Sequence, residues 1–141
     1  MCSSDLERKR LKILCIDDDL TTLLMLKSRL ERRDGQKVYT ATDGKSGVAL
    51  AKKVQPDAIL IDWEMPVMSG IETVKALRSH RATTWIPRFM LTARRNMRYF
   101  ERAAKAGVEG YFTKPVELGQ ISTRLNILAA GPNTPLRCTR P

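Results

Sequence analysis

Long apolar runs are missing from this sequence of 141 residues. No stretch approaches the roughly 20 apolar residues that a helix needs to cross a bilayer. The first ten residues also lack the apolar segment of a signal peptide. We therefore expect a protein without a membrane span or a membrane partner, and we expect it in the cytoplasm.

Cysteine and histidine are scarce as well. The three cysteines lie far apart and have neither metal-ligand nor redox spacing, which fits a reduced compartment. Cys15 stands inside an apolar run, so it is expected to be a small buried hydrophobe. His80, the single histidine, follows a helical pattern and is expected to be exposed, without a catalytic role.

Acidic residues are the minority among the charged ones. The sequence has 15 Asp and Glu against 25 Lys and Arg, a net charge of +10. Such a balance favours acidic partners, whether an acidic protein face, nucleic acid or an anionic surface. Net charge alone does not choose among these partners.

What the sequence does contain is an alternation of five short apolar runs with segments of helical periodicity. Parallel strands need helical crossovers, so the alternation predicts an α/β fold. The expected architecture is a doubly wound, five-stranded parallel sheet of flavodoxin-like order 2-1-3-4-5, with helices on both faces. We expect one domain at 11–130, between a basic N-terminal tail at 1–10 and a flexible C-terminal tail, or the start of a linker, at 131–141. The expected strands are 11–16, 37–41, 58–61, 88–91 and 110–112.

Carboxylates stand where two of these strands end. Asp17, Asp18 and Asp19 follow the first apolar run, and Asp62 follows the third. In the expected strand order these two strands flank the switch point, where ligands bind in open α/β sheets. Clustered like charges need a compensating cation, so the pattern predicts a hard-metal site. Asp19 is expected to cap the first helix instead.

Three further features belong to the same edge of the expected sheet. The fourth strand runs into Thr92 and Ala93, and the fifth is followed by Lys114 and Pro115. A loop that must double back closely, residues 63–70, comes after Asp62 and contains the motif of residues 65–70. The strand-end aspartates, this loop, Thr92–Ala93 and Lys114–Pro115 follow one another along the chain in the order typical of a response-regulator receiver domain. The chain resembles such a domain over roughly residues 12–128.

The resemblance implies a chemistry. Asp62 would accept a phosphoryl group from a phosphohistidine, supplied by a sensor histidine kinase or a histidine phosphotransfer protein. Transfer and loss of the group would be self-catalysed, so the protein is not expected to be an enzyme in the usual sense. Mg²⁺, for which Mn²⁺ can substitute, would be held by Asp17, Asp18, Asp62 and the backbone carbonyl of Glu64. Lys114 would pair with Asp62 and then with the phosphoryl oxygens.

The resemblance also implies a switch. The hydroxyl of Thr92 would move to the phosphoryl group, and Tyr111 would turn inward with it. In receiver domains, the positions that Glu64 and Arg94 would occupy flank the phosphoryl group and help to set its lifetime. A Glu–Arg pair could exclude the hydrolytic water, so we expect a longer lifetime than in fast chemotaxis regulators.

The basic segment after the fourth strand has two interpretations. It is either a solvated helix face or the surface through which the switch acts. In receiver domains the fourth helix, fifth strand and fifth helix form the usual face for partners, here a downstream protein or a lost effector domain. A homodimer through this face is left open, whereas the absence of a DNA-binding motif argues against direct nucleic-acid binding. The expected partner face consists of Arg95, Arg98, Arg102 and Lys105.

Two other functions compete with the switch. A Mg²⁺-dependent aspartyl-phosphate phosphohydrolase would also use a strand-end aspartate as its nucleophile. Such enzymes usually carry a second Asp two residues later, where this sequence has Glu64. A phosphorylation-independent binding module would keep the pocket as a relic. Trp63 is expected to lie partly exposed beside the site.

Overall fold

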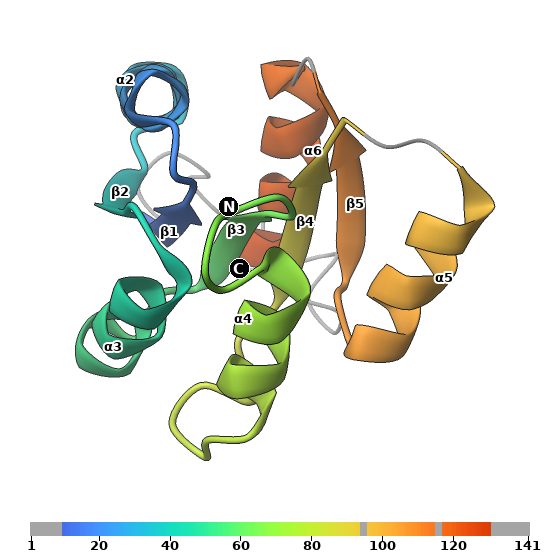
Figure 1. Cartoon of the computed structure of the whole chain (residues 1–141). Helices are drawn as coiled ribbons and strands as arrows, with labels where there is room; N and C mark the ends of the chain where they lie inside the picture. The colour runs from blue at the N-terminus through green and yellow to red at the C-terminus, as the bar shows by residue number, and fades with distance from the viewer. Residues whose placement is uncertain (1–9, 94–95, 115–116, 131–141) are drawn as a thin grey trace.

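The computed structural model describes residues 10–93, 96–114 and 117–130. Strands and helices alternate through this part of the chain, from β1 to α6 (Figure 1). The strands are β1 (Lys12–Ile16), β2 (Lys37–Ala41), β3 (Ala58–Asp62), β4 (Arg88–Thr92) and β5 (Gly110–Thr113). The helices are α2 (Leu20–Asp34), α3 (Gly44–Val54), α4 (Gly70–Arg78), α5 (Met97–Ala106) and α6 (Leu118–Ala130).

The five strands form one parallel sheet of order β2-β1-β3-β4-β5. The predicted fold class and strand order are therefore confirmed. The third, fourth and fifth strands each run one residue further than expected, which brings Asp62, Thr92 and Thr113 into the sheet. The expected tails fall outside the described residues, apart from Arg10.

Two hydrophobic cores lie on opposite faces of the sheet, because successive strand side chains point to opposite sides. In β1, Leu14 and Ile16 pack with α3, α4 and α5, whereas Ile13 and Cys15 pack with α2 and α6. Every residue of β3 and β4 is buried, as expected for central strands covered on both sides. Cys15 is a buried free cysteine, as its position predicted.

Helix caps fix where the helices begin. The carboxylate of Asp19 accepts hydrogen bonds from Thr21 N (3.1 Å) and Thr22 Oγ1 (2.8 Å), so the predicted capping role is confirmed. Ser69 and Glu72 form a capping box at the start of α4. Of the helices in the described part of the chain, none is both long and apolar enough to cross a membrane.

Candidate functional site

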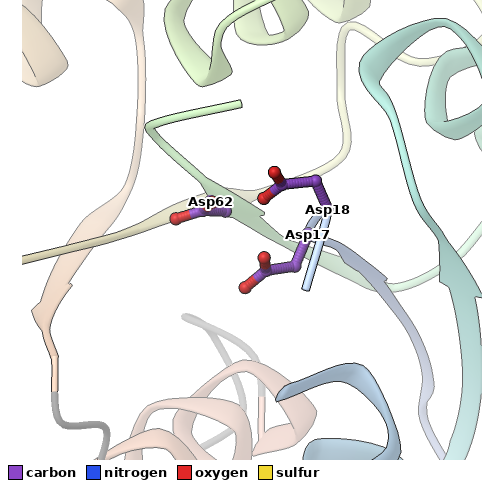
Figure 2. A group of neighbouring side chains, drawn as sticks. All are labelled: Asp17, Asp18 and Asp62. Carbon is purple, nitrogen blue, oxygen red and sulfur yellow. The ribbon is translucent and has the colours of Figure 1, made fainter. Parts of the chain in front are cut away.

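The carboxylates at the strand ends come together as their positions predicted. β1 and β3 are neighbours, with Ile16 in register with Ile61, so both strands deliver their next residue to the same edge. Figure 2 shows the carboxylates of Asp17, Asp18 and Asp62 turned toward a common space. Each offers an oxygen, and these oxygens lie within 4.8 Å of one another. The three side chains therefore form one acidic cluster.

Two of the three carboxylates are buried. Asp17 is 1% exposed and Asp62 is 5% exposed, whereas Asp18 faces solvent. The backbone holds Asp17 in place, because its N–H donates to Ala41 O (3.1 Å) and its Oδ1 accepts from Asp19 N (2.9 Å). Asp19 therefore contributes its side chain to α2 and its N–H to the cluster.

Lys114 supplies the positive charge that the cluster needs. Its Nζ lies 2.9 Å from Oδ1 of Asp62 and 3.4 Å from Oδ2 of Asp17. The residue follows β5, and its N–H donates to the carbonyl of Thr92 (2.7 Å), which continues the pairing of β4 with β5. The ammonium therefore comes from the far end of the chain to bridge two buried carboxylates.

The burial of these groups changes their pKa values. Burial raises the pKa of Asp62 to about 6, although the hydrogen bond from Lys114 acts in the opposite direction. Burial also raises the pKa of Asp17, against the hydrogen bond from Asp19 and the charge of Lys114. Burial alone would lower the pKa of Lys114, but its contact with Asp62 outweighs this and raises it. The site thus holds negative charge that a single ammonium does not fully compensate.

The donor set fits a small divalent cation. It contains carboxylate oxygens only, the ligands that hard cations such as Mg²⁺ prefer. Three carboxylates and one ammonium leave a formal charge of −2, which a divalent cation would balance. Glu64 lies in the loop just beyond Asp62, with its side chain exposed.

Thr92 and Tyr111 lie beside the acidic cluster. Thr92 ends β4 and is 1% exposed. Burial raises the pKa of Tyr111, and a hydrogen bond with the side chain of Thr92 partly opposes this shift. The ring of Tyr111 packs edge-on against Phe100 of α5, with centroids 4.3 Å apart. These contacts link the end of β4 to α5 through one tyrosine.

Trp63 is buried, so the expectation of a partly exposed side chain is wrong. Its ring is 4% exposed and packs edge-on against Tyr99, with centroids 4.9 Å apart. The guanidinium of Arg102 lies 5.3 Å from the ring centroid. The N–H of Trp63 donates to Leu91 O (2.9 Å), which extends the pairing of β3 with β4 and places the indole beneath α5.

Gly70 ends the loop that was predicted to double back after Asp62, and the structure shows why this position must be glycine. Its N–H donates to Trp63 O (2.8 Å), and a Cβ at this position would lie 2.5 Å from the carbonyl oxygen of Asp62. The loop after Asp62 can therefore return to the strand only if this residue lacks a side chain. The available signal was the glycine at the end of a loop that had to double back.

Three of the four residues of the expected partner face lie in the described part of the chain. Arg98, Arg102 and Lys105 are exposed on α5. Arg102 and Lys105 border α4 together with Ile71, rather than the β5 side of the helix. Arg94 and Arg95 lie outside the described residues, and so does Pro115.

Comparison with known proteins agrees with this geometry. Residues 13–126 match the family model of the response regulator receiver domain. The chemotaxis protein CheY-3 of Vibrio cholerae is 32% identical over 118 residues, which cover 84% of this chain and 91% of that protein.

The solved structures that are similar to the chain include two with high TM-scores. That of the Vibrio cholerae chemotaxis protein CheY4 has a TM-score of 0.79 at 31% identity, and the alignment covers 84% of this chain and 98% of that one. The receiver domain of the sensor histidine kinase PA1611 from Pseudomonas aeruginosa, solved with a magnesium ion in its active-site cleft, has a TM-score of 0.78 at 25% identity, with 87% and 100% covered. With its sheet order, its acidic cluster and these similarities, the chain belongs to the response-regulator receiver domains of two-component signalling.

Proposed function

We propose that this receiver domain is a phosphorylation switch in which Asp62 accepts a phosphoryl group from a phosphohistidine. The donor would be a sensor histidine kinase or a histidine phosphotransfer protein. The observation that carries the proposal is the ammonium of Lys114, 2.9 Å from Asp62, within a cluster of three carboxylates. Family membership favours this function over a phosphohydrolase or a binding module without phosphorylation.

The reaction requires an ionised Asp62. With a pKa of about 6, this carboxyl is mostly a carboxylate above pH 7. One of its oxygens attacks the phosphorus, and the bond between phosphorus and the imidazole nitrogen breaks. The electron pair of that bond stays on the nitrogen, and an acyl phosphate forms on Asp62. Lys114, already within hydrogen-bond distance, remains beside the transferred group and offsets the charge of its oxygens.

Mg²⁺ bound by Asp17, Asp18, Asp62 and the backbone carbonyl of Glu64 would reduce the repulsion between the carboxylates and the incoming phosphoryl oxygens. Mn²⁺ has similar ligand preferences and could take its place. Asp19 contributes through its N–H, which orients the carboxylate of Asp17 (2.9 Å). Transfer to Asp62 and hydrolysis of the acyl phosphate are reactions of the domain on itself, so no substrate is turned over.

The switch would act through Thr92 and Tyr111. A phosphoryl oxygen on Asp62 would accept a hydrogen bond from the hydroxyl of Thr92, which interacts with Tyr111 in the present arrangement. Tyr111 would then change its packing against Phe100, and α5 would respond. The phosphoryl group would thus favour one of two arrangements that exist beforehand. A downstream protein, a lost effector domain or a second copy would read this change on the face formed by α5, β5 and α6.

The acceptance of the phosphoryl group can be tested by mass spectrometry of the intact protein. With Mg²⁺ and acetyl phosphate, we expect the parent chain to gain the mass of one phosphoryl group. Asp62→Asn should gain none. Asp43→Asn is the matched control, because Asp43 caps α3 and Asn is an equally good cap. A parent chain that stays unmodified, or an Asp62→Asn variant that is modified equally, would contradict the proposal.

The lifetime of the group is a separate prediction. Glu64 lies in the exposed loop after Asp62, and Arg94, outside the described residues, follows Thr92 by two positions. If these side chains exclude the hydrolytic water, Glu64→Asn should speed the release of phosphate several-fold. An unchanged release rate in Glu64→Asn would show that Glu64 does not exclude the hydrolytic water. The proposed transfer to Asp62 would not be affected by that result.

A further inference from the structure

An open groove of about 230 Å³ lies between α4 and α5, away from the acidic cluster. The two helices are neighbours on one face of the sheet (Figure 1). The groove combines cationic walls with an apolar floor. It is lined by Ile71 and Lys75 of α4 and by Arg102, Lys105 and Ala106 of α5.

The cations of α5 form a stripe along the helix. Arg98, Arg102 and Lys105 stand at positions i, i+4 and i+7, which share one side of an α-helix. Phe100 lies on the other side, where it contacts Tyr111 of β5. Arg102 and Lys105 of this stripe border the groove beside α4, whereas Phe100 faces β5.

The cations that line the groove form no ion pairs in the part of the chain that the structure describes. Within the described residues, no carboxylate forms an ion pair with Lys75, Arg102 or Lys105. Glu72, also on α4, is engaged at the start of the helix, where its carboxylate accepts from Ser69 N (2.8 Å). Three unpaired cations around one hollow repel each other, and an anionic ligand would relieve that repulsion.

The groove is held open by a contact between its two helices. The guanidinium of Arg78 donates to the carbonyls of Ala106 (2.9 Å) and Lys105 (3.4 Å) at the end of α5. Gly107 ends this helix with a φ of 98°, and a Cβ there would lie 2.8 Å from Cδ of Arg78. The arginine thus fixes the spacing of α4 and α5, so the groove exists before any ligand arrives.

We propose that this groove is a docking site for an acidic peptide segment of a partner protein. An apolar side chain of the segment would cover Ile71 and Ala106, and flanking carboxylates would pair with Lys75, Arg102 and Lys105. The floor is aliphatic, formed by Ile71 and Ala106, and among the described residues that line the groove it offers no aromatic ring on which a base could stack, which favours a peptide over nucleic acid. The site goes beyond the phosphorylation switch, and its binding requires no phosphoryl group on Asp62.

Binding of the peptide should change the fluorescence of Trp63. Arg102 lines the groove and also lies over the ring of Trp63. A carboxylate that draws this guanidinium toward the groove would alter the environment of the indole. Trp85, the other of the two tryptophans, is exposed and donates to Ala82 O (3.0 Å), so a Trp85→Phe background isolates the signal of Trp63.

The test is a selection of 12-residue peptides from a random displayed library against the full chain. We expect enrichment of peptides with an apolar residue between acidic ones. A selected peptide should bind the double variant Lys75→Glu/Lys105→Glu at least tenfold more weakly than the parent. Lys52→Glu/Lys53→Glu is the matched control, because both lysines are exposed in the last turn of α3 and the change in net charge is equal.

Alanine variants are a milder change and control for a loss of folding in the charge-reversed proteins. Lys75→Ala/Lys105→Ala should weaken the same peptide several-fold, whereas Lys52→Ala/Lys53→Ala should not. The proposal is overturned if acidic–apolar peptides are not enriched, if both charge reversals weaken binding equally, or if binding leaves Trp63 fluorescence unchanged. A single-stranded oligonucleotide that displaces the peptide and binds more tightly would assign the groove to nucleic acid instead.

Discussion

The guanidinium of Arg102 lies 5.3 Å from the ring centroid of Trp63, the residue directly after Asp62 in the chain. The same guanidinium lies 5.7 Å from the ring of Tyr99. One side chain of α5 therefore contacts the segment that carries the proposed phosphoryl acceptor. This relationship joins the end of β3 to α5, whereas the contact of Tyr111 with Phe100 joins β5 to the same helix.

Removing the cation from this stack should weaken the fold and change the indole signal. We expect Arg102→Ala to lower the free energy of unfolding by about 0.5–2 kcal/mol, the usual range for a cation over an aromatic face. Trp63 fluorescence should shift in the folded variant. Arg98→Ala is the control, because Arg98 is exposed one turn earlier on the same stripe. Equal losses in both variants would assign the effect to general surface charge.

Asp62→Asn should stabilise the metal-free protein at neutral pH. The pKa of Asp62 is about 6 in the folded state against 3.8 as an unperturbed group. Its favourable contribution is therefore complete below about pH 4 and is lost as the pH rises through 6. At pH 7.5 the variant avoids the cost of a buried charge, and we expect it to unfold with a free energy higher by roughly 1–3 kcal/mol.

Chemical denaturation at two pH values measures this effect. The advantage of Asp62→Asn should disappear near pH 3.5, and Mg²⁺ at pH 7.5 should reduce it by stabilising the parent. Asp43→Asn should show no gain, because its hydrogen bonds to Ser46 lower the pKa of Asp43 in the folded state. A parent that is the more stable protein at pH 7.5 without metal would show that Lys114 fully compensates the buried charge.

Lys114→Met should separate metal binding from the response to phosphorylation. The variant keeps Asp17, Asp18 and Asp62, so Trp63 fluorescence should still report a titration with Mg²⁺. The variant lacks the ammonium that offsets the charge of the phosphoryl oxygens. The change in Trp63 fluorescence on addition of acetyl phosphate or beryllofluoride should therefore fall at least tenfold. Lys12→Met is a control lysine outside the site, since its Nζ donates to Val54 O (3.0 Å). A full response in Lys114→Met would remove the role proposed for Lys114.

Gly70→Ala should damage the loop that supports Asp62. The added Cβ would lie 2.5 Å from Asp62 O and 2.7 Å from the Cα of Trp63. Both are backbone atoms, so a change of side-chain rotamer cannot relieve the overlap. We expect a loss of about 1–3 kcal/mol in the free energy of unfolding, as for other overpacked sites. Gly119→Ala in α6 is the control, because its nearest neighbour would be 4.0 Å away. That change should be neutral or stabilising by up to about 1 kcal/mol.

Much of the acidic cluster could be predicted because it depends on local pattern. Each of Asp17 and Asp62 ends an apolar run, and parallel strands bring such ends to one edge of the sheet. Lys114 could be placed at the same edge for the same reason. Asp19 could be separated from the cluster because helix N-caps favour aspartate.

The burial of Trp63 could not be predicted in this way. From the sequence alone, a tryptophan at the end of a strand is expected to be half-exposed, because the position of the helix that covers it is unknown. Here the cover consists of Tyr99 and Arg102, which lie more than 30 positions later in the chain. The contacts of Gly70 could not be predicted for a related reason, since its close neighbours are backbone atoms of Asp62 and Trp63.

The order of the elements, the carboxylates at the sheet edge and the basic stripe on one helix all follow from the local pattern of residues. Periodicity makes Arg98, Arg102 and Lys105 share a side of α5, but it does not say what that side faces. What that side faces depends on how the elements pack, because the burial of Ala103 and Ala106 sets the rotation of the helix about its axis. With those small residues packed inward, Arg102 and Lys105 face the groove beside α4, and Arg102 also contacts the residue next to Asp62.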